Sequence, residues 1–225
     1  MAILPLFSCS ARINGSLAAD GSAAVSVSMA LEPRMTSLIR TLSAAGGQDG
    51  GQILDGNAIA QSMSVSSAGN VLASFKNTSP SAIEGSVRIS DISLFLTAPN
   101  AGEFIEFEQR KNGGECKFYI DINNGPVILK LLSVEIAAYL EALMAPLATG
   151  EEMTKTEYLE LVSSIYSKAI SDEIASSQLR ASINFPGQIT SATGGTFSGK
   201  KAEFDIPLLE LLVLETPLVY EVNWK

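Results

Sequence analysis

The chain has 225 residues, a net charge of −9 and no histidine, with 46% hydrophobic and 17% charged residues. This length and composition indicate a folded chain with a substantial core and exclude a disordered one. The acidic charge disfavours nucleic acid and anionic membranes as electrostatic partners, because both are themselves negatively charged. The absence of histidine removes the commonest general base and most zinc-site designs, so it weakens the case for catalysis.

The N-terminal segment carries a motif around its cysteine. Leu6-Phe7-Ser8-Cys9 resembles a lipobox, with an aliphatic residue at −3 and a small residue at −1, although Phe7 replaces the usual small residue at −2. We interpret residues 1–9 as the remnant of a signal peptide, with Cys9 as the lipid attachment point. The alternative is an apolar strand with a buried free thiol. A disulfide between Cys9 and Cys116 is also open.

Residues 11–31 alternate between apolar and small or polar side chains on either side of Asp20-Gly21, a strong hairpin turn signal. The pattern predicts a β-hairpin with one face in a core and small residues on the other. The residues expected to face the core are Ala11, Ile13, Leu17, Ala23, Val25, Val27, Met29 and Leu31.

Further elements follow in chain order. Pro33 begins a helix through about Leu42, and Asp55 caps a short second helix. Residues 71–76 and 85–93 are expected to be strands.

Residues 104–122 predict a second hairpin that turns at Asn112-Gly113-Gly114. In this hairpin Glu106, Glu108 and Arg110 are expected to lie across from Lys117 and its neighbours, as cross-strand charge pairs.

Two long helices are expected next. Residues 127–147 are apolar over most of the helical circumference, so this helix must be buried on several sides or must face something apolar. A second helix, residues 154–177, begins with a capping box formed by Thr154 and Glu157. The two helices are expected to form a helical hairpin.

The C-terminal third returns to β-structure. Residues 179–185, 201–206 and 218–224 are expected to be strands, and residues 208–214 a short apolar helix or strand. We therefore predict one α+β domain over residues 10–225. Its antiparallel sheet or sheets of hairpins would pack against a long apolar helix pair.

The helix at 127–147 has two interpretations: the central helix of a packed core, or one wall of a cavity for an acyl chain. Pockets for small ligands are mostly apolar, which fits the second interpretation. The segment 207–214 would supply a second wall. The residues expected to line such a cavity are Ile128, Leu131, Leu132, Ile136, Leu140, Leu143, Leu208 and Leu211.

Two patterns could support catalysis. The carboxylates at positions 103, 106, 108, 115 and 121 could include a glycosidase-like pair, but an ion-paired hairpin face is the stronger interpretation. Ser198-Gly199-Lys200-Lys201 matches S-x-x-K, but it lies in a glycine-rich turn rather than at the start of a buried helix. No catalytic residue, metal or cofactor is assigned, because no metal-binding or nucleotide-binding spacing is present.

The two ends of the chain together suggest a family. The opening consists of the lipobox-like Cys9, the Asp20-Gly21 hairpin and the Pro33 helix. The close consists of the run Ile183 to Gly187, then Thr193-Gly194-Gly195, a strand and a final Trp224. This arrangement, over about a third of the chain, resembles the LppM-like bacterial lipoproteins. The resemblance implies a sheet and packed helices around an apolar pocket, with lipid or glycolipid as the ligand.

We expect a lipoprotein tethered to a membrane of the bacterial cell envelope, on its periplasmic or surface side. It would bind lipid or another apolar small molecule beside residues 127–147 and would not be an enzyme. The alternative is a structural or interaction lipoprotein with a packed core. A hydrolase ranks third.

Overall fold

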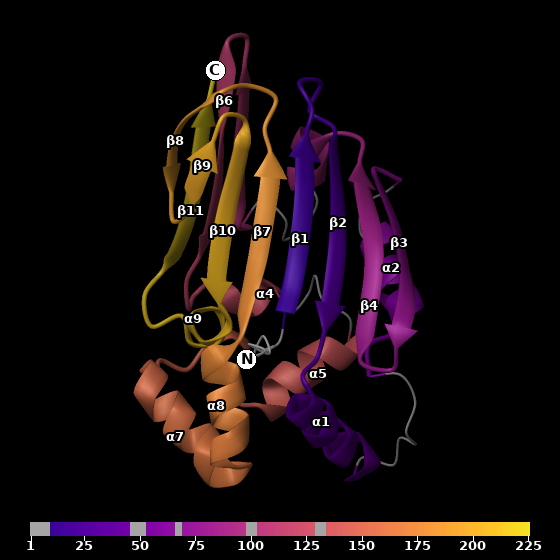
Figure 1. Ribbon diagram of the computed structural model, residues 1–225, viewed down its shortest axis with the longest axis vertical. Coiled ribbons are helices and arrows are strands. Elements are labelled where there is room, and N and C mark those ends of the chain that lie inside the picture. The colour runs from indigo at the N-terminus through magenta and orange to yellow at the C-terminus, as the bar shows by residue number, and fades with distance from the viewer. Residues whose placement is uncertain (1–9, 46–52, 66–68, 98–102, 129–133) are drawn as a thin grey trace, which may run out of the picture.

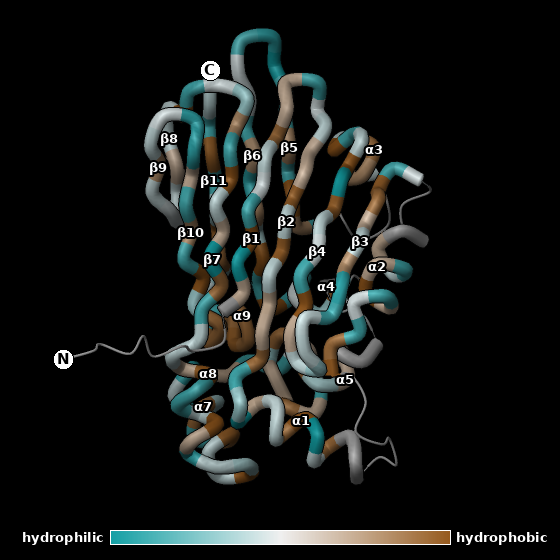
Figure 2. Tube along the Cα trace, turned by 45° about the vertical axis from the view of Figure 1, so that its right-hand side comes forward, coloured by the Kyte–Doolittle hydropathy of each residue, from teal (hydrophilic) through white to brown (hydrophobic). Residues whose placement is uncertain are grey.

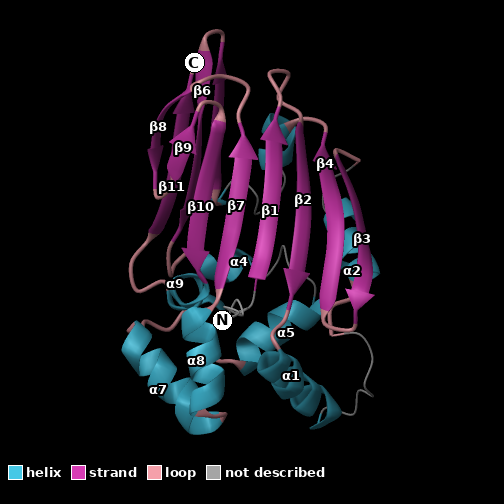
Figure 3. Ribbon diagram, viewed as in Figure 1, coloured by secondary structure: helices cyan, strands magenta, loops and turns pink. Residues whose placement is uncertain are grey.

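The computed structural model describes residues 10–45, 53–65, 69–97, 103–128 and 134–225 (Figure 1). Two β-sheets make up the body of the molecule, and most helices gather at one end of them (Figure 3). The α+β class predicted from the sequence is confirmed, whereas its long helix pair is not found.

The larger sheet has seven strands in the order β3-β4-β2-β1-β7-β10-β9. Hydrophobic and hydrophilic residues alternate along these strands (Figure 2), so one face is apolar and the other polar. The strands are β1 (Ser10–Leu17), β2 (Ala23–Ala30), β3 (Val71–Ser79), β4 (Ala82–Ile89), β7 (Gln178–Asn184), β9 (Thr196–Ser198) and β10 (Lys201–Pro207).

The first hairpin is confirmed, since β1 and β2 pair along their whole length. Its loop closes with hydrogen bonds from the Gly21 N–H to the Ala18 carbonyl (3.1 Å) and from the Ala18 N–H to the Ser22 carbonyl (2.8 Å). Gly21 has a φ of 84°, a left-handed conformation that glycine adopts without steric cost. The Asp20 carboxylate accepts a hydrogen bond from the Ser22 N–H (3.0 Å) and stabilises the turn.

The other neighbour of β1 is β7, and these two strands run parallel. The expectation of purely antiparallel sheets is wrong at this position. Both strands begin at the end of the sheet where the helices lie, and the chain enters β7 directly from α8. Strands so far apart in sequence leave no local signal of their pairing.

The smaller sheet has the strand order β5-β6-β11-β8. It contains the predicted second hairpin, β5 (Ile105–Arg110) and β6 (Gly113–Ile120), together with β8 (Ile189–Thr193) and β11 (Leu218–Trp224). Glu106 is the register partner of Lys117, and their side chains form an ion pair at 3.5 Å. The predicted cross-strand charge pairing is thereby confirmed at this position.

An aromatic core joins the two sheets at the end opposite the helices. Trp224 of β11 is 3% exposed and packs on Phe185 and Phe107, with ring centroids 5.1 and 6.2 Å away. Phe204 and Ala202 of β10 belong to the same cluster. This end of the molecule is therefore filled by side chains.

The expected long helix 127–147 is wrong. The described segments are three short helices, α4 (Gly125–Ile128), α5 (Val134–Ala142) and α6 (Pro146–Thr149). Met144 takes a left-handed conformation with φ of 51°, and Pro146 begins the next helix. Proline has no N–H and its ring clashes with the preceding turn, so no helix continues through it.

The second expected helix also divides in two, α7 (Lys155–Ile165) and α8 (Lys168–Ser176). Ser167 between them is extended, and its hydroxyl accepts a hydrogen bond from the Ile170 N–H (3.4 Å), which caps α8. The capping box of Thr154 and Glu157 at the start of α7 is confirmed. The serine cap turns the chain back toward the larger sheet.

The remaining helices are α1 (Pro33–Ala45), α2 (Gly56–Val65), α3 (Ile92–Leu96) and α9 (Leu208–Val213). Asp55 caps α2 as predicted, because its carboxylate accepts from the N–H groups of Asn57 and Ala58. α2 lies against β3, and α1, α5, α8 and α9 meet below the larger sheet. Within the described part of the chain, no helix has the length and apolar character needed to cross a membrane.

Candidate apolar ligand site

A cavity of about 280 Å³ lies where the larger sheet meets α1, α5, α8 and α9. Side chains from three strands and four helices surround it. The lining residues are Ala11, Met29, Leu31, Met35, Ile39, Leu54, Tyr139, Leu140, Leu143, Glu173, Ile174, Ser177, Leu179, Leu208, Leu211 and Leu212.

The sheet forms one wall of the cavity through three adjacent positions. Ala11 of β1 is the register partner of both Met29 on β2 and Leu179 on β7. Cross-strand neighbours on one face point the same way, so these three side chains form a row. Because Ala11 in the middle is a single methyl group, the row has a hollow at its centre.

Helices α1 and α8 form a second wall. Met35 and Ile39 are four residues apart on α1, so both point to the same side of the helix. Ile174 of α8 faces them and is 1% exposed.

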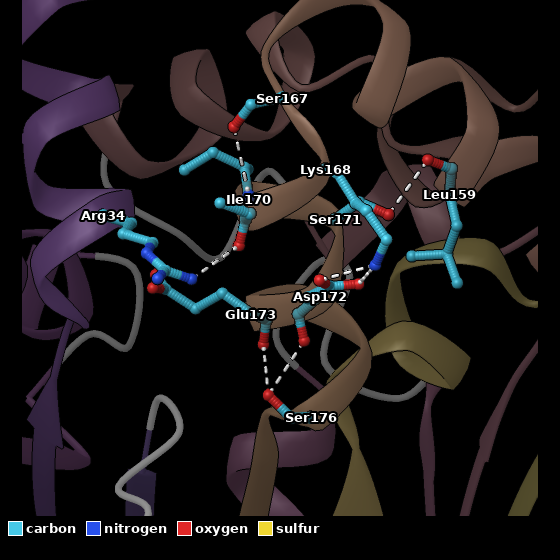
Figure 4. A network of polar contacts seen from close by, with 10 residues as sticks. Arg34, Leu159, Ser167, Lys168, Ile170, Ser171, Asp172, Glu173 and Ser176 are labelled. Atoms are coloured by element: carbon cyan, nitrogen blue, oxygen red, sulfur yellow. Dashed lines mark hydrogen bonds and ion pairs between the residues drawn. The ribbon is translucent and has the colours of Figure 1, made fainter.

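A polar clamp holds these two helices together, and Figure 4 shows two of its residues, Arg34 of α1 and Glu173 of α8. The Glu173 carboxylate of α8 accepts a hydrogen bond from the Met35 N–H at 2.9 Å, in the first turn of α1. Arg34 of α1 donates in return to the Ala169 carbonyl of α8 at 3.4 Å. A carboxylate at a helix N-terminus satisfies a free N–H and interacts well with the helix dipole. The position of this wall is therefore fixed by hydrogen bonds as well as by packing.

Helices α5 and α9 form the remaining wall of the cavity, which is partly open to the surface. Leu140 and Leu143 come from the end of α5, and Leu208, Leu211 and Leu212 come from α9. The Leu208 N–H donates to the Ser177 carbonyl at 2.9 Å, which anchors α9 to the end of α8. α9 is hydrophobic over most of its length (Figure 2) and contributes three leucines to the cavity.

Three of the lining residues carry a polar group, namely Tyr139, Glu173 and Ser177, but the surface that the wall presents to the cavity is apolar. The Glu173 carboxylate binds the N–H of α1, and the Ser177 hydroxyl donates to the Glu173 carbonyl at 2.6 Å. Nearby, burial and then the charge of Glu173 raise the pKa of Glu32. The lining is therefore apolar, as is typical of small-ligand pockets.

The residues expected from the sequence divide into two groups. Leu140, Leu143, Leu208 and Leu211 lie together on this cavity. Leu131 and Leu132 lie outside the described residues. Ile128 belongs to α4 and Ile136 to α5, but their side chains are not described.

Sequence reasoning missed the contributions of β1, β2, α1 and α8 to the cavity. A signal existed for part of it, because Ala11 and Met29 were already expected to face inward. Their place beside Leu179 depends on the parallel pairing of β1 with β7, which no local pattern encodes.

The proposed lipid attachment point, Cys9, lies outside the described residues. Cys116 is a free, half-buried thiol on β6. Burial, with a smaller contribution from the charge of Glu115, raises the pKa of Cys116 to about 11.

The carboxylate cluster of the second hairpin is largely paired with cations. Glu106 pairs with Lys117, and the Arg110 guanidinium binds the Glu108 carboxylate at 2.6 Å and lowers its pKa. Over the ranges that the structure describes, no group of three or more Cys, Asp or Glu side chains could hold a metal ion.

The S-x-x-K match lies across a β-turn. Ser198 of β9 and Lys201 of β10 are register partners on neighbouring strands, and the Lys201 ammonium binds Glu203 at 2.6 Å. The serine therefore does not begin a helix, which that motif requires.

No protein-family model matches the chain, and no curated protein matches it in sequence. Among solved structures, the chain is similar to the NMR structure of the folded domain of LppM from Mycobacterium tuberculosis. The match covers 100% of this chain and 95% of that one, with 10% identity and a TM-score of 0.43. This is a weak structural relation that concerns the fold alone.

Proposed function

We propose that this protein binds a lipid or another apolar ligand in the cavity between the larger sheet and helices α1, α5, α8 and α9. The observation that supports the proposal is the cavity itself. It measures about 280 Å³, and the surface exposed on its wall is apolar, although Tyr139, Glu173 and Ser177 are among the lining residues. The pocket is partly open to the surface, so a hydrocarbon chain can enter it from solvent and be buried against its walls.

The expected driving force is the removal of hydrocarbon from water. Each buried methylene contributes about 0.8 kcal/mol. The wall is held in place by the α1–α8 clamp and by the α8–α9 hydrogen bond, so little ordering is needed when a ligand enters. A binding role fits these features better than catalysis, and we propose that the protein is not an enzyme.

Native mass spectrometry of the purified protein tests this function. We expect co-purifying lipid, or uptake of phospholipid on titration. A clean apo mass with no uptake would refute the proposal and would favour a structural or interaction protein instead.

A matched pair of substitutions assigns any uptake to this cavity. Ala11→Phe places a ring in the hollow of the sheet wall, so we expect lipid uptake to be lost. Ala24→Phe makes the same change on the exposed face of β2, so uptake is expected to persist. Equal uptake by both variants would place the ligand elsewhere.

We further propose that Cys9 carries a lipid that tethers the protein to a membrane of the bacterial cell envelope. The motif at residues 6–9 supports this proposal, and so does the acidic charge, which would not hold an anionic bilayer by electrostatics. The test is to grow cells that express the full chain in the presence of labelled palmitate, and we expect the protein to become labelled. Label that persists in Cys9→Ala would contradict the tether.

A further inference from the structure

From the size of the cavity we infer that it encloses one unbranched hydrocarbon chain of about eleven carbons, with the head group left outside. This inference rests on the proposed function. An apolar cavity of about 150 Å³ holds one benzene molecule of six carbons, so each carbon takes roughly 25 Å³. At that density the 280 Å³ cavity holds about eleven carbons.

The lining explains why only hydrocarbon is enclosed. The Glu173 carboxylate already accepts from the Met35 N–H, and the Ser177 hydroxyl already donates to a carbonyl. The surface exposed on the wall is apolar, so a charged or strongly polar head group moved into this space would lose its water without gaining a hydrogen-bond partner there, which is costly. A ligand of this class is therefore a single-chain amphiphile, or a lipid that inserts one medium-length chain.

The same lining sets the length limit. Ala11 leaves the hollow in the sheet wall, and the half-buried Leu211 of α9 lines the cavity from the helical end. Carbons beyond the limit remain outside the cavity, where they bury less surface.

Binding of n-alkylphosphocholines with eight to sixteen carbons tests the limit, because the head group stays constant. Titration calorimetry is run below each critical micelle concentration. Affinity is expected to rise about fourfold per added methylene up to about eleven carbons, as full burial of a methylene predicts. Beyond that length the gain is expected to fall below twofold per methylene.

The break is the chain length at which the gain in affinity per methylene falls. Two substitutions should move this break in opposite directions. Leu211→Ala removes three carbons from the wall, so the break shifts to a chain about three carbons longer. Ala11→Leu adds three carbons, so the break shifts to a chain about three carbons shorter. Leu72→Ala and Ala24→Leu make the same two changes at exposed positions outside the cavity and should leave the break unchanged.

The outcomes separate the two proposals. The length limit is overturned if affinity keeps rising at the same rate to sixteen carbons. It is also overturned if the break does not move in variants whose circular dichroism matches that of the wild type. Either result leaves lipid binding intact. If no alkylphosphocholine of any length binds the folded wild-type protein, both the limit and the proposed function fail. Met29→Ala serves as a second enlarging variant if Leu211→Ala does not fold.

Discussion

The clamp between α1 and α8 offers a direct test of how the cavity wall is held. Glu173→Ala removes the carboxylate that accepts from the Met35 N–H at 2.9 Å, in a partly buried position. Leaving such an N–H without a partner costs about 1–3 kcal/mol, and losing a charge near a helix N-terminus costs roughly 0.3–1 kcal/mol. We expect the free energy of unfolding to fall by about 2 kcal/mol.

Relief of repulsion works against this loss and limits its size. Burial and the charge of Glu173 raise the pKa of Glu32, so the ionised Glu32 is less stable in the folded protein than in the unfolded chain. For a raised pKa, stability is fully present below the unfolded value and is lost as pH rises through the folded value. Removing Glu173 leaves burial as the remaining cause, so the pKa of Glu32 should move part of the way back toward its ordinary value.

Urea unfolding followed by circular dichroism measures both effects. A loss of 2 kcal/mol corresponds to a fall in Tm of about 4–8 °C for a protein of this size. Asp172→Ala is the matched control, because Asp172 is the adjacent residue of α8 and forms only an exposed ion pair with Lys168. That pair is worth about 0.3–0.5 kcal/mol. Equal losses for the two variants would refute the clamp.

Two further predictions concern other parts of the fold. Thr154→Ala removes the capping box of α7 and should lower the free energy of unfolding, measured in urea, by about 1 kcal/mol. Thr154→Ser keeps the hydroxyl and should lower it little. Equal losses for the two variants would show that the cap is not the cause. In a Cys9→Ala background, Cys116 should react slowly with iodoacetamide at pH 8 until the protein unfolds, because burial raises its pKa to about 11. Since the folded pKa is the higher one, this thiol's contribution to stability is lost as pH rises toward 11. Rapid alkylation of the folded protein would contradict the buried environment.

Local patterns in the sequence predicted local structure well. The alternation around Asp20-Gly21 located the first hairpin, and the spacing of Thr154 and Glu157 located the start of α7. Each of these features depends on residues close together in the chain.

The helix pair shows where such patterns fail. Continuous apolar composition over residues 127–147 predicted one helix, but Met144 adopts a left-handed conformation and Pro146 starts a new helix. Proline is favourable in the first turn of a helix, so its position was compatible with either a break or an end.

The candidate site was predictable only in part, for a similar reason. Leu140, Leu143, Leu208 and Leu211 stand out by composition alone and lie on the cavity. Ala11 has no such signal. It contributes a small side chain between the larger Met29 and Leu179, and the pairing of its strand with β7 could not be predicted from the sequence.

The parallel pairing of β1 with β7 also has a consequence for how the protein is made. About 160 residues separate the two strands, so the edge of β1 has no partner when the first hairpin leaves the ribosome. At about 5–20 residues per second, β7 follows roughly 8–30 s later. An unpaired strand edge is a template for pairing with another chain. We therefore expect the nascent protein to depend on chaperones during this interval.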